Sequence, residues 1–218
     1  QTLKMADYQS LLSDATLVTH ISPEVTSSGQ VIYGANNTTT SLYGESPEYL
    51  DIKLWTVEEG DCFNEEDVKK SAKVCVVGRT IVKELFGDKD APCVGKTIRF
   101  KSIPFRIVGV LKAKGYNSWG MDQDNVIIAP YTTVMKRIAA QTYFNSINMS
   151  ALSEDLSDAA IEEITGIIRH NHKLKDDAED DFTIRSQQEM METMGSTMDT
   201  ITIILVVAAA FSLLVAGI

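Results

Sequence analysis

The sequence predicts an α+β fold in which an α/β part is split in sequence by an inserted β-rich part and is followed by a membrane-spanning helix. Three observations carry this prediction. Helical and strand-like patterns occur at both ends of the folded part, strand patterns dominate its middle, and residues 200–218 contain no charged side chain. The two end segments each need the other to complete a sheet, which makes the middle an insertion.

The α/β part begins at residues 3–13, where apolar residues recur at helical spacing. The stretch ATLVTHISPEV (residues 15–25) predicts a strand that ends at Pro23, because proline has no amide proton for a ladder. QVIYGANNTTTSLYG (residues 30–44) predicts a strand that runs into a polar loop.

The middle is β-rich and has two helical segments. We expect strands in KVCVVG (73–78), TIRFKSIPFRIVGVL (97–111) and NVIIAP (125–130), and helices in RTIVKELFG (79–87) and YTTVMKRIAAQ (131–141). Gly87 is a suitable residue to end the first of these helices.

The second half of the α/β part has the order strand, helix, strand. FNSINMSAL (144–152) and FTIRS (182–186) predict the strands, and residues 157–174 predict the helix between them, with Ser157 as its N-cap. Residues 187–199 then lead helically into the apolar tail.

The tail at residues 200–218 is apolar on every helical face. At 1.5 Å per residue it would span about 28 Å, close to the ~30 Å hydrocarbon core of a bilayer. No Lys or Arg follows Arg185, whereas Glu189 and Asp199 precede the tail, so the preceding flank is expected outside the cell. The alternative is a buried core helix or a dimer seam.

The formal net charge of −10 argues against a nucleic-acid partner, because an acidic protein repels phosphate backbones. Part of this charge lies in the run KDDAEDD (residues 175–181), which we expect to be a solvated loop. The alternative is that the carboxylates of this run form a weak calcium site.

No catalytic, metal or cofactor motif is complete, so we predict a protein that is not an enzyme and has no cofactor. CVGKTI has Asp90 where a phosphate-binding loop needs glycine. His170 and His172 have no third ligand nearby in sequence, and His20 lies far from both. Cys62, Cys75 and Cys93 are expected to be buried, although one disulfide remains open.

The loop AKGYNSWGMDQDN (113–125) contains Tyr116, Trp119 and Met121 among glycines and polar residues, without the periodicity of a core element. Apolar side chains on such a loop are typical of a protein-binding site. We therefore take these three as candidate partner-binding residues. The alternative is that Trp119 folds back over the local sheet.

Five stretches together resemble the MacB-type periplasmic core domain of ABC-transporter permeases. They are SPEYLDIKLWTVEEGDCFNEED (46–67), KVCVVGRTIVKELFG (73–87), PCVGKTIRFKSIPFRIVGVL (92–111), DNVIIAPYTTVMKRI (124–138) and LLVAGI (213–218). These are packing and turn motifs without catalytic residues. Their order and spacing carry the resemblance.

The resemblance implies a porter-like α/β subdomain at residues 1–48 and 145–199, an inserted sabre-like subdomain at 49–144, and a transmembrane helix at 200–218. It implies a domain that faces the periplasm from the bacterial inner membrane, within a longer permease. The expected partners are a cytoplasmic ATP-binding domain or subunit, a second permease copy, and a periplasmic adaptor. The function it implies is export, with cytoplasmic ATP hydrolysis coupled to periplasmic movement (mechanotransmission).

Two other functional classes are alternatives to a transporter component. A sensory or ligand-binding ectodomain would use the same helix to pass a signal across the membrane. A membrane-anchored hydrolase is disfavoured, because the groups it needs do not cluster in sequence.

Overall fold

The computed structural model describes residues 2–191. The chain divides into two compact units, Gln1–Glu179 and Asp180–Ile218, and each is described by itself. The helices of the first unit are α1 (Met5–Asp14), α2 (Tyr49–Ile52), α3 (Glu65–Lys70), α4 (Arg79–Phe86), α5 (Tyr131–Val134) and α6 (Ser157–Asn171), with a π-helical turn η1 (Met135–Ala139) and a 3-10 turn η2 (Glu154–Leu156). Its strands are β1 (Val18–Tyr33), β2 (Asn36–Glu45), β3 (Val57–Gly60), β4 (Val74–Val77), β5 (Thr97–Phe100), β6 (Ile103–Leu111), β7 (Val126–Pro130) and β8 (Ser146–Ala151).

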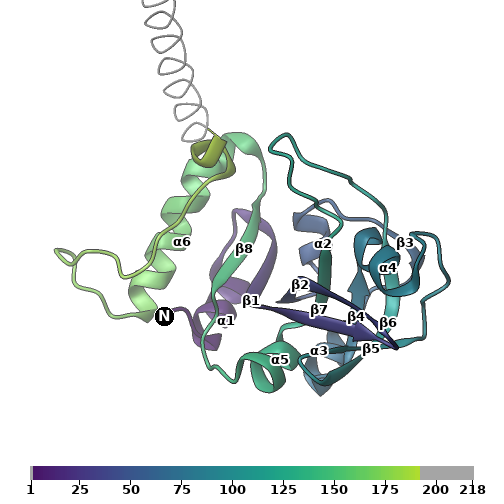
Figure 1. The fold of residues 1–218 in the computed structure, drawn as a ribbon. Coiled ribbons are helices and arrows are strands. Elements are labelled where there is room, and N and C mark those ends of the chain that lie inside the picture. The colour runs from purple at the N-terminus through teal and green to yellow at the C-terminus, as the bar shows by residue number, and fades with distance from the viewer. Residues whose placement is uncertain (1, 192–218) are drawn as a thin grey trace, which may run out of the picture. The chain divides into compact units, whose positions relative to one another are not determined.

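Most strands form a closed ring (Figure 1). The pairing order is β2-β7-β4-β6-β5-β1, and β1 pairs again with β2 to close it. The sheet is mixed: β2 with β7 and β4 with β6 are parallel, whereas the other pairs are antiparallel. The ring is closed by the β1–β2 pairing, and β3 pairs with the C-terminal part of β6, after the residues that pair with β5. The predicted α+β class is confirmed.

Strand β1 belongs to two pairings. Its first half, from Val18 to Glu24, pairs with β8, and its second half, from Val25 to Tyr33, pairs with β2. Helices α1 and α6 lie beside the β1–β8 pair (Figure 1). The Glu163 carboxylate accepts hydrogen bonds from the Thr16 and Leu17 amides at 2.9 Å each, which joins α6 to the start of β1.

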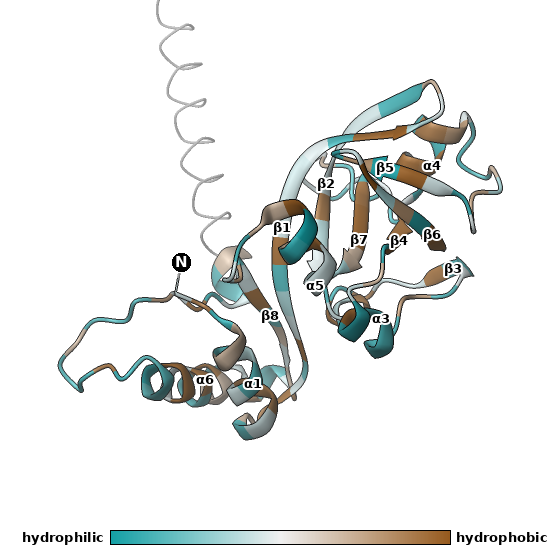
Figure 2. Cartoon of the chain, turned by 90° about the horizontal axis from the view of Figure 1, so that it is seen from below, coloured by the Kyte–Doolittle hydropathy of each residue, from teal (hydrophilic) through white to brown (hydrophobic). Residues whose placement is uncertain are grey.

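The ring is filled by apolar side chains, because alternate residues of each strand point inward. Figure 2 shows apolar residues gathered on β4, β6 and β7 and along α6. The largest fully buried apolar side chains are Leu11, Leu42, Ile81, Leu85, Ile98, Phe100, Phe105, Ile107, Leu111, Ile127 and Ile128. Nearly all of them lie in or against the ring.

The prediction that the first strand ends at Pro23 is wrong, because β1 continues through it to Tyr33. The Ile21 amide points away from β8, where it donates to the Glu48 carboxylate at 2.8 Å. Residues two apart in a strand direct their amides to the same side. The missing amide proton of Pro23 therefore falls on the side that no strand pairs with, and the ladder loses no bond.

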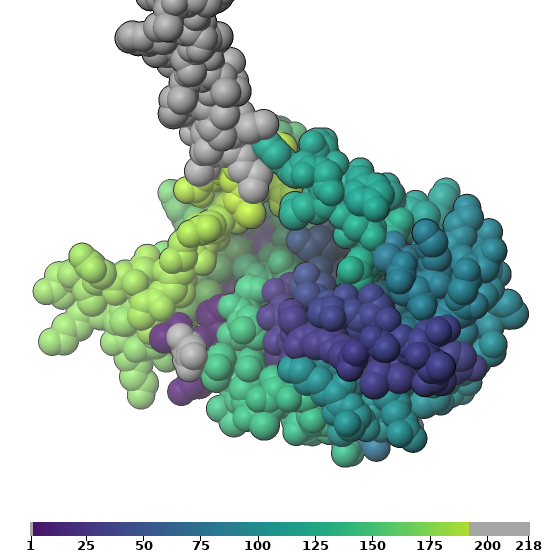
Figure 3. All heavy atoms as spheres, viewed as in Figure 1, coloured from purple at the N-terminus to yellow at the C-terminus, as the bar shows by residue number. Residues whose placement is uncertain are grey.

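The predicted polar loop after Tyr33 is also wrong, because residues 36–45 form β2. Gly34 and Ala35 make a two-residue turn, with Tyr33 opposite Asn36. Gly34 has a positive φ of 58°, which such a turn requires. Seen from outside, the β1–β2 hairpin is a dark-purple band across one face (Figure 3). The threonines of β2 are strand formers in spite of their polarity.

Most other elements match the predictions. Helices at 3–13, 79–87 and 157–174 and strands at 73–78, 125–130 and 144–152 are confirmed. The stretch 97–111 divides into two strands at Lys101 and Ser102, which have φ of 46° and 70°. Helix 131–141 consists of α5 and η1.

Two local predictions fail. Ser157 is the first residue of α6 rather than its cap, because the turn η2 precedes it and Leu156 takes the cap position. The predicted strand 182–186, in the second unit, pairs with no described strand, so its alternating pattern has no ladder to join.

Residues 187–191 are helical, as predicted. The predicted membrane segment 200–218, and residues 192–199 before it, lie outside the described residues. Within residues 2–191, no helix combines the length and the apolar composition needed to cross a membrane.

Candidate partner-binding loop

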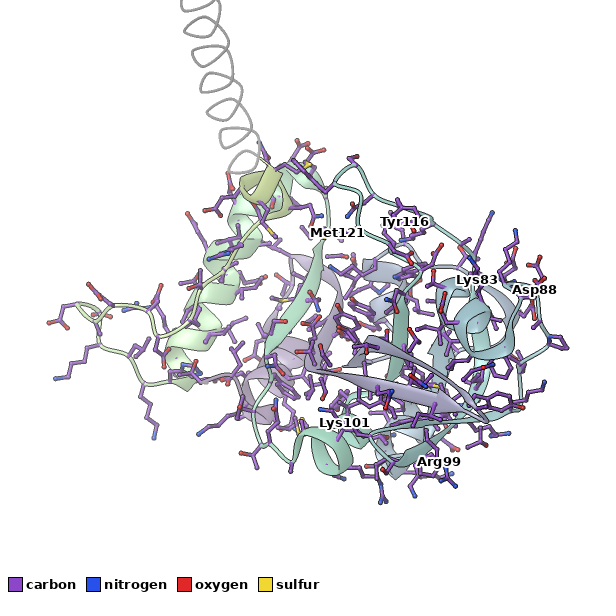
Figure 4. The ribbon with its side chains drawn as sticks, viewed as in Figure 1. Lys83, Asp88, Arg99, Lys101, Tyr116 and Met121 are labelled. Atoms are coloured by element: carbon purple, nitrogen blue, oxygen red, sulfur yellow. The ribbon has the colours of Figure 1, made fainter. Side chains whose placement is uncertain are left out.

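The candidate residues lie on the segment 113–124, which connects β6 to β7. Tyr116 is 72% exposed, Trp119 49% and Met121 58%. Tyr116 and Met121 lie at one end of the first unit, opposite Arg99 and Lys101 (Figure 4). Trp119 covers the neighbouring structure only in part, so all three apolar side chains are available at the surface.

The tip of the loop is held by Asn117. Its side-chain oxygen accepts hydrogen bonds from the amides of Trp119 and Met121, both at 3.0 Å. The Asn117 amide donates to the Met121 carbonyl at 3.0 Å, and the Gly120 amide donates to the Asn117 carbonyl at 2.9 Å. Gly120 has a φ of 75°, which favours glycine there. The apolar residues are thus presented on an ordered turn.

The base of the loop is held by the buried carboxylate of Asp124, which is 6% exposed. One of its oxygens accepts from the Lys114 amide at 2.8 Å and the other from the Gly115 amide at 2.9 Å. Two charge-assisted bonds to backbone amides close the loop on itself. A loop closed in this way loses less entropy when it binds a partner than a flexible one does.

A second carboxylate ties the loop to helix α4. Asp122 accepts a hydrogen bond from the Thr80 hydroxyl at 2.7 Å and from the Asp124 amide at 2.8 Å. Gly78, the residue before α4, packs against the same segment: a Cβ atom at this position would lie 2.1 Å from the Asp124 carbonyl oxygen. The loop therefore depends on the first turn of α4.

The segment that follows α2 also contacts the loop base, although its sequence did not predict this role. The Lys114 Nζ lies 4.1 Å from the centroid of the Trp55 ring and donates to the Lys53 carbonyl. Partial burial, and then the charge of Lys53, lower the pKa of Lys114 below its ordinary value. Beside Trp55, Leu54 is 82% exposed and has a φ of 53°. In the sequence, two large apolar residues side by side in a polar stretch, Leu54 and Trp55, could have indicated this contact.

The other sequence candidates do not assemble into a site. Cys62, Cys75 and Cys93 are free thiols, and burial raises the pKa of Cys62 to about 12. The His172 Nε2 lies 3.2 Å from a carboxylate oxygen of Asp7, where it joins α6 to α1. Among the described residues, no three His, Cys, Asp or Glu side chains are placed to hold a metal ion.

The acidic residues 176, 177 and 179–181 are exposed, as predicted for a solvated loop.

A family model described as "MacB-like periplasmic core domain" matches residues 1–167. A "macrolide export ATP-binding/permease protein MacB" of Chlorobium luteolum is 36% identical over 190 residues, which cover 87% of this chain and 28% of the relative. A protein of the same description from Syntrophobacter fumaroxidans is 29% identical over 272 residues, covering 100% of this chain and 38% of the relative. The chain thus spans well under half of each of these relatives.

Solved structures show the same fold. The periplasmic region of MacB from Actinobacillus actinomycetemcomitans superimposes with a TM-score of 0.74 at 26% identity, over 89% of this chain and 84% of that one. The extracellular domain of the noncanonic ABC-type transporter YknZ from Gram-positive bacteria reaches a TM-score of 0.67 at 18% identity, over 79% and 86%. At 18% identity, the similarity to the YknZ domain shows a shared fold and nothing about function.

Proposed function

Because this chain belongs to the MacB-like periplasmic core domain family, we propose that it is the extracytoplasmic part of an ABC-transporter permease that works in export. The observation that carries the proposal is the family match over residues 1–167, together with relatives described as ATP-binding/permease proteins. The part of those relatives that this chain does not span has room for an ATP-binding domain. ATP hydrolysis would then occur in the cytoplasm, and this domain would transmit its motion.

We further propose a porter-like part and a sabre-like part, as the division into residues 1–48, 49–144 and 145–199 predicts. The two pairings of β1 support two parts, since its first half joins β8 and its second half joins the ring. The ring also includes β2, so residues 1–48 would contribute strands to both parts. Motion between the parts would act on β1, the strand they share.

For residues 200–218 we propose a membrane span, with the folded domain on the periplasmic side of the inner membrane and a second permease copy beside it. The test uses the longer natural protein in intact cells, with Cys62, Cys75 and Cys93 replaced by alanine. New cysteines are placed at Asp199 and, in a second variant, just after Ile218. We expect a membrane-impermeant thiol reagent to label only the first. Labelling of both positions would contradict the membrane span and, with it, the permease.

For the loop we propose contact with a periplasmic adaptor through Tyr116, Trp119 and Met121. The ordered turn and the exposed aromatic side chains support this role, since aromatic residues dominate binding energy at interfaces. We expect Trp119→Ala to weaken adaptor binding about tenfold, or about 1.4 kcal/mol, without loss of folding. Asp124→Ala, which opens the loop base, should weaken binding as well.

Binding is measured by biolayer interferometry between the purified chain and the adaptor of the same transporter. Leu12→Ala is the matched control, because Leu12 is 52% exposed on α1 and far from the loop in sequence. Unchanged affinity for both loop variants would remove the adaptor role from this loop. If Trp119→Ala instead abolished the binding of a small molecule, the result would support a ligand-binding ectodomain and contradict adaptor contact through this loop.

A further inference from the structure

Two glutamates face each other where β1 leaves β8 and joins the ring. The last opposing pair of the β1–β2 ladder is Val25 with Gly44, so Glu24 and Glu45 follow as the next pair. Like charges directly opposite on adjacent antiparallel strands repel each other and destabilise the pair. Two ionised carboxylates are therefore an unfavourable pair at this position.

Glu45 is completely buried, with 0% of its surface exposed. Its Oε2 accepts a hydrogen bond from the Ser22 hydroxyl at 2.6 Å, and the same Ser22 oxygen accepts from the Ser46 amide at 2.9 Å. The buried Oε1 has no donor among the described residues. A buried carboxylate oxygen without a donor is costly, whereas a protonated one becomes a donor itself.

Glu24 differs from Glu45 in its surroundings. It is only partly buried, and each of its carboxylate oxygens accepts a hydrogen bond. One of its oxygens accepts from the Ser146 hydroxyl at 2.9 Å, and the other accepts from the Asn148 side-chain amide at 3.0 Å. Both donors come from β8. Both oxygens of Glu24 therefore already act as acceptors, so Glu24 is the acceptor of the pair.

The remaining groups around Glu45 do not neutralise it. Tyr43 on β2 and Tyr49 on α2 are phenols, and burial raises the pKa of each. Lys53, at the end of α2, lowers the pKa of Glu45, but its effect is smaller than that of burial and of Glu24. Burial, then the charge of Glu24 and a hydrogen bond shared with it, raise the pKa of Glu45 well above its ordinary value. The carboxylate of Glu48, a further acidic residue on this side of β1, accepts a hydrogen bond from the Ile21 amide.

We propose that Glu45 holds a proton in the folded protein and donates it to the carboxylate of Glu24. One shared proton then fastens the end of β2 to β1 and, through the bonds of Glu24, to β8. Release of the proton leaves two facing carboxylates at the strand that joins the two pairings, which loosens the junction. The junction is thus a pH-sensitive device, and it does not depend on the proposed transport function.

The sign of the pH dependence follows from proton binding. An unfolded glutamate releases its proton near pH ~4.3, whereas the folded chain keeps this proton to a higher pH. Stability therefore falls as pH rises above about 4, by up to tenfold in the folding equilibrium constant per pH unit. The fall stops once the folded chain has released the proton.

The test compares the 218-residue chain with Glu45→Gln, in mild detergent. Glutamine is neutral, can still donate to Glu24 and can still accept from Ser22. We expect this variant to fold and to lose the fall in stability that the wild type shows as pH rises above about 4. Glu66→Gln is the control, because Glu66 is exposed on α3, and its pH profile should match the wild type. An unchanged pH profile in Glu45→Gln would overturn the proposal.

A direct measurement on the wild-type chain keeps the test decisive if Glu45→Gln does not fold. Carbon-13 NMR of the glutamate carboxyls should show one carboxyl that titrates well above the others. Glu24→Gln should lower that titration, because it removes the neighbouring charge. If every glutamate carboxyl of the wild type titrated near its ordinary value, the shared proton would not exist.

Discussion

Replacing Gly78 with alanine is expected to lower the free energy of unfolding by about 3 kcal/mol or more. The backbone angles of Gly78, φ −81° and ψ 164°, suit any residue, so the cause is steric. A Cβ atom would lie 2.1 Å from the Asp124 carbonyl oxygen and 2.8 Å from its carbonyl carbon. The Gly78 amide donates to the Val126 carbonyl at 2.9 Å, which prevents the two segments from separating without loss of that bond.

The same substitution should also release the loop, because Asp124 holds the loop base. Thermal or urea unfolding gives the stability, and hydrogen exchange of the Lys114 and Gly115 amides reports on the loop. Gly166→Ala is the matched control: a Cβ there meets nothing within 4 Å, and α6 should gain about 0.5–1 kcal/mol. Equal stability of both variants would show that this contact is not tight.

Replacing Arg79 with alanine is expected to cost about 2–3 kcal/mol. The Arg79 side chain is 8% exposed, and it donates to Glu58 at 2.6 Å and to Glu59 at 2.8 Å. A further bond goes to the Lys89 carbonyl at 2.9 Å. These contacts join the first turn of α4 to β3. The two glutamates are 47% and 40% exposed, so water solvates them after the substitution and the cost stays below that of a fully buried pair.

Arg79→Lys tests whether the planar guanidinium matters. Lysine keeps the charge but cannot present the same fork of donors, so we expect an intermediate loss. The difference between wild type and Arg79→Ala should shrink in about 1 M salt, where the Debye length is about 3 Å. Equal stability of wild type and Arg79→Ala at low salt would contradict this account.

Local patterns were reliable where a segment's own residues decide its structure. The alternation from Phe105 to Val110 predicts a strand, and the isoleucines of residues 161–168 predict a helix whose apolar face includes the buried Ile164 and Ile168. The exposure of Tyr116 and Met121 was also expected from the sequence. Each of these depends on neighbours within a few positions.

Other features depend on partners distant in sequence. Pro23 ends a strand only if its amide side is paired, and that side is open because β8, residues 146–151, lies on the other side of β1. Glu45 looks like a surface residue until the register of β1 and β2 places it opposite Glu24.

The α+β class, most helices and strands, the family resemblance and the exposed apolar loop were thus all predictable from the order of the residues. Four features became visible only in the folded chain: the closed ring, the continuation of β1 through Pro23, the contact of Trp55 with the loop base, and the buried glutamate pair. The physical reason is that periodicity records which face of a segment is buried, whereas strand register and loop packing are set by residues far away in the chain.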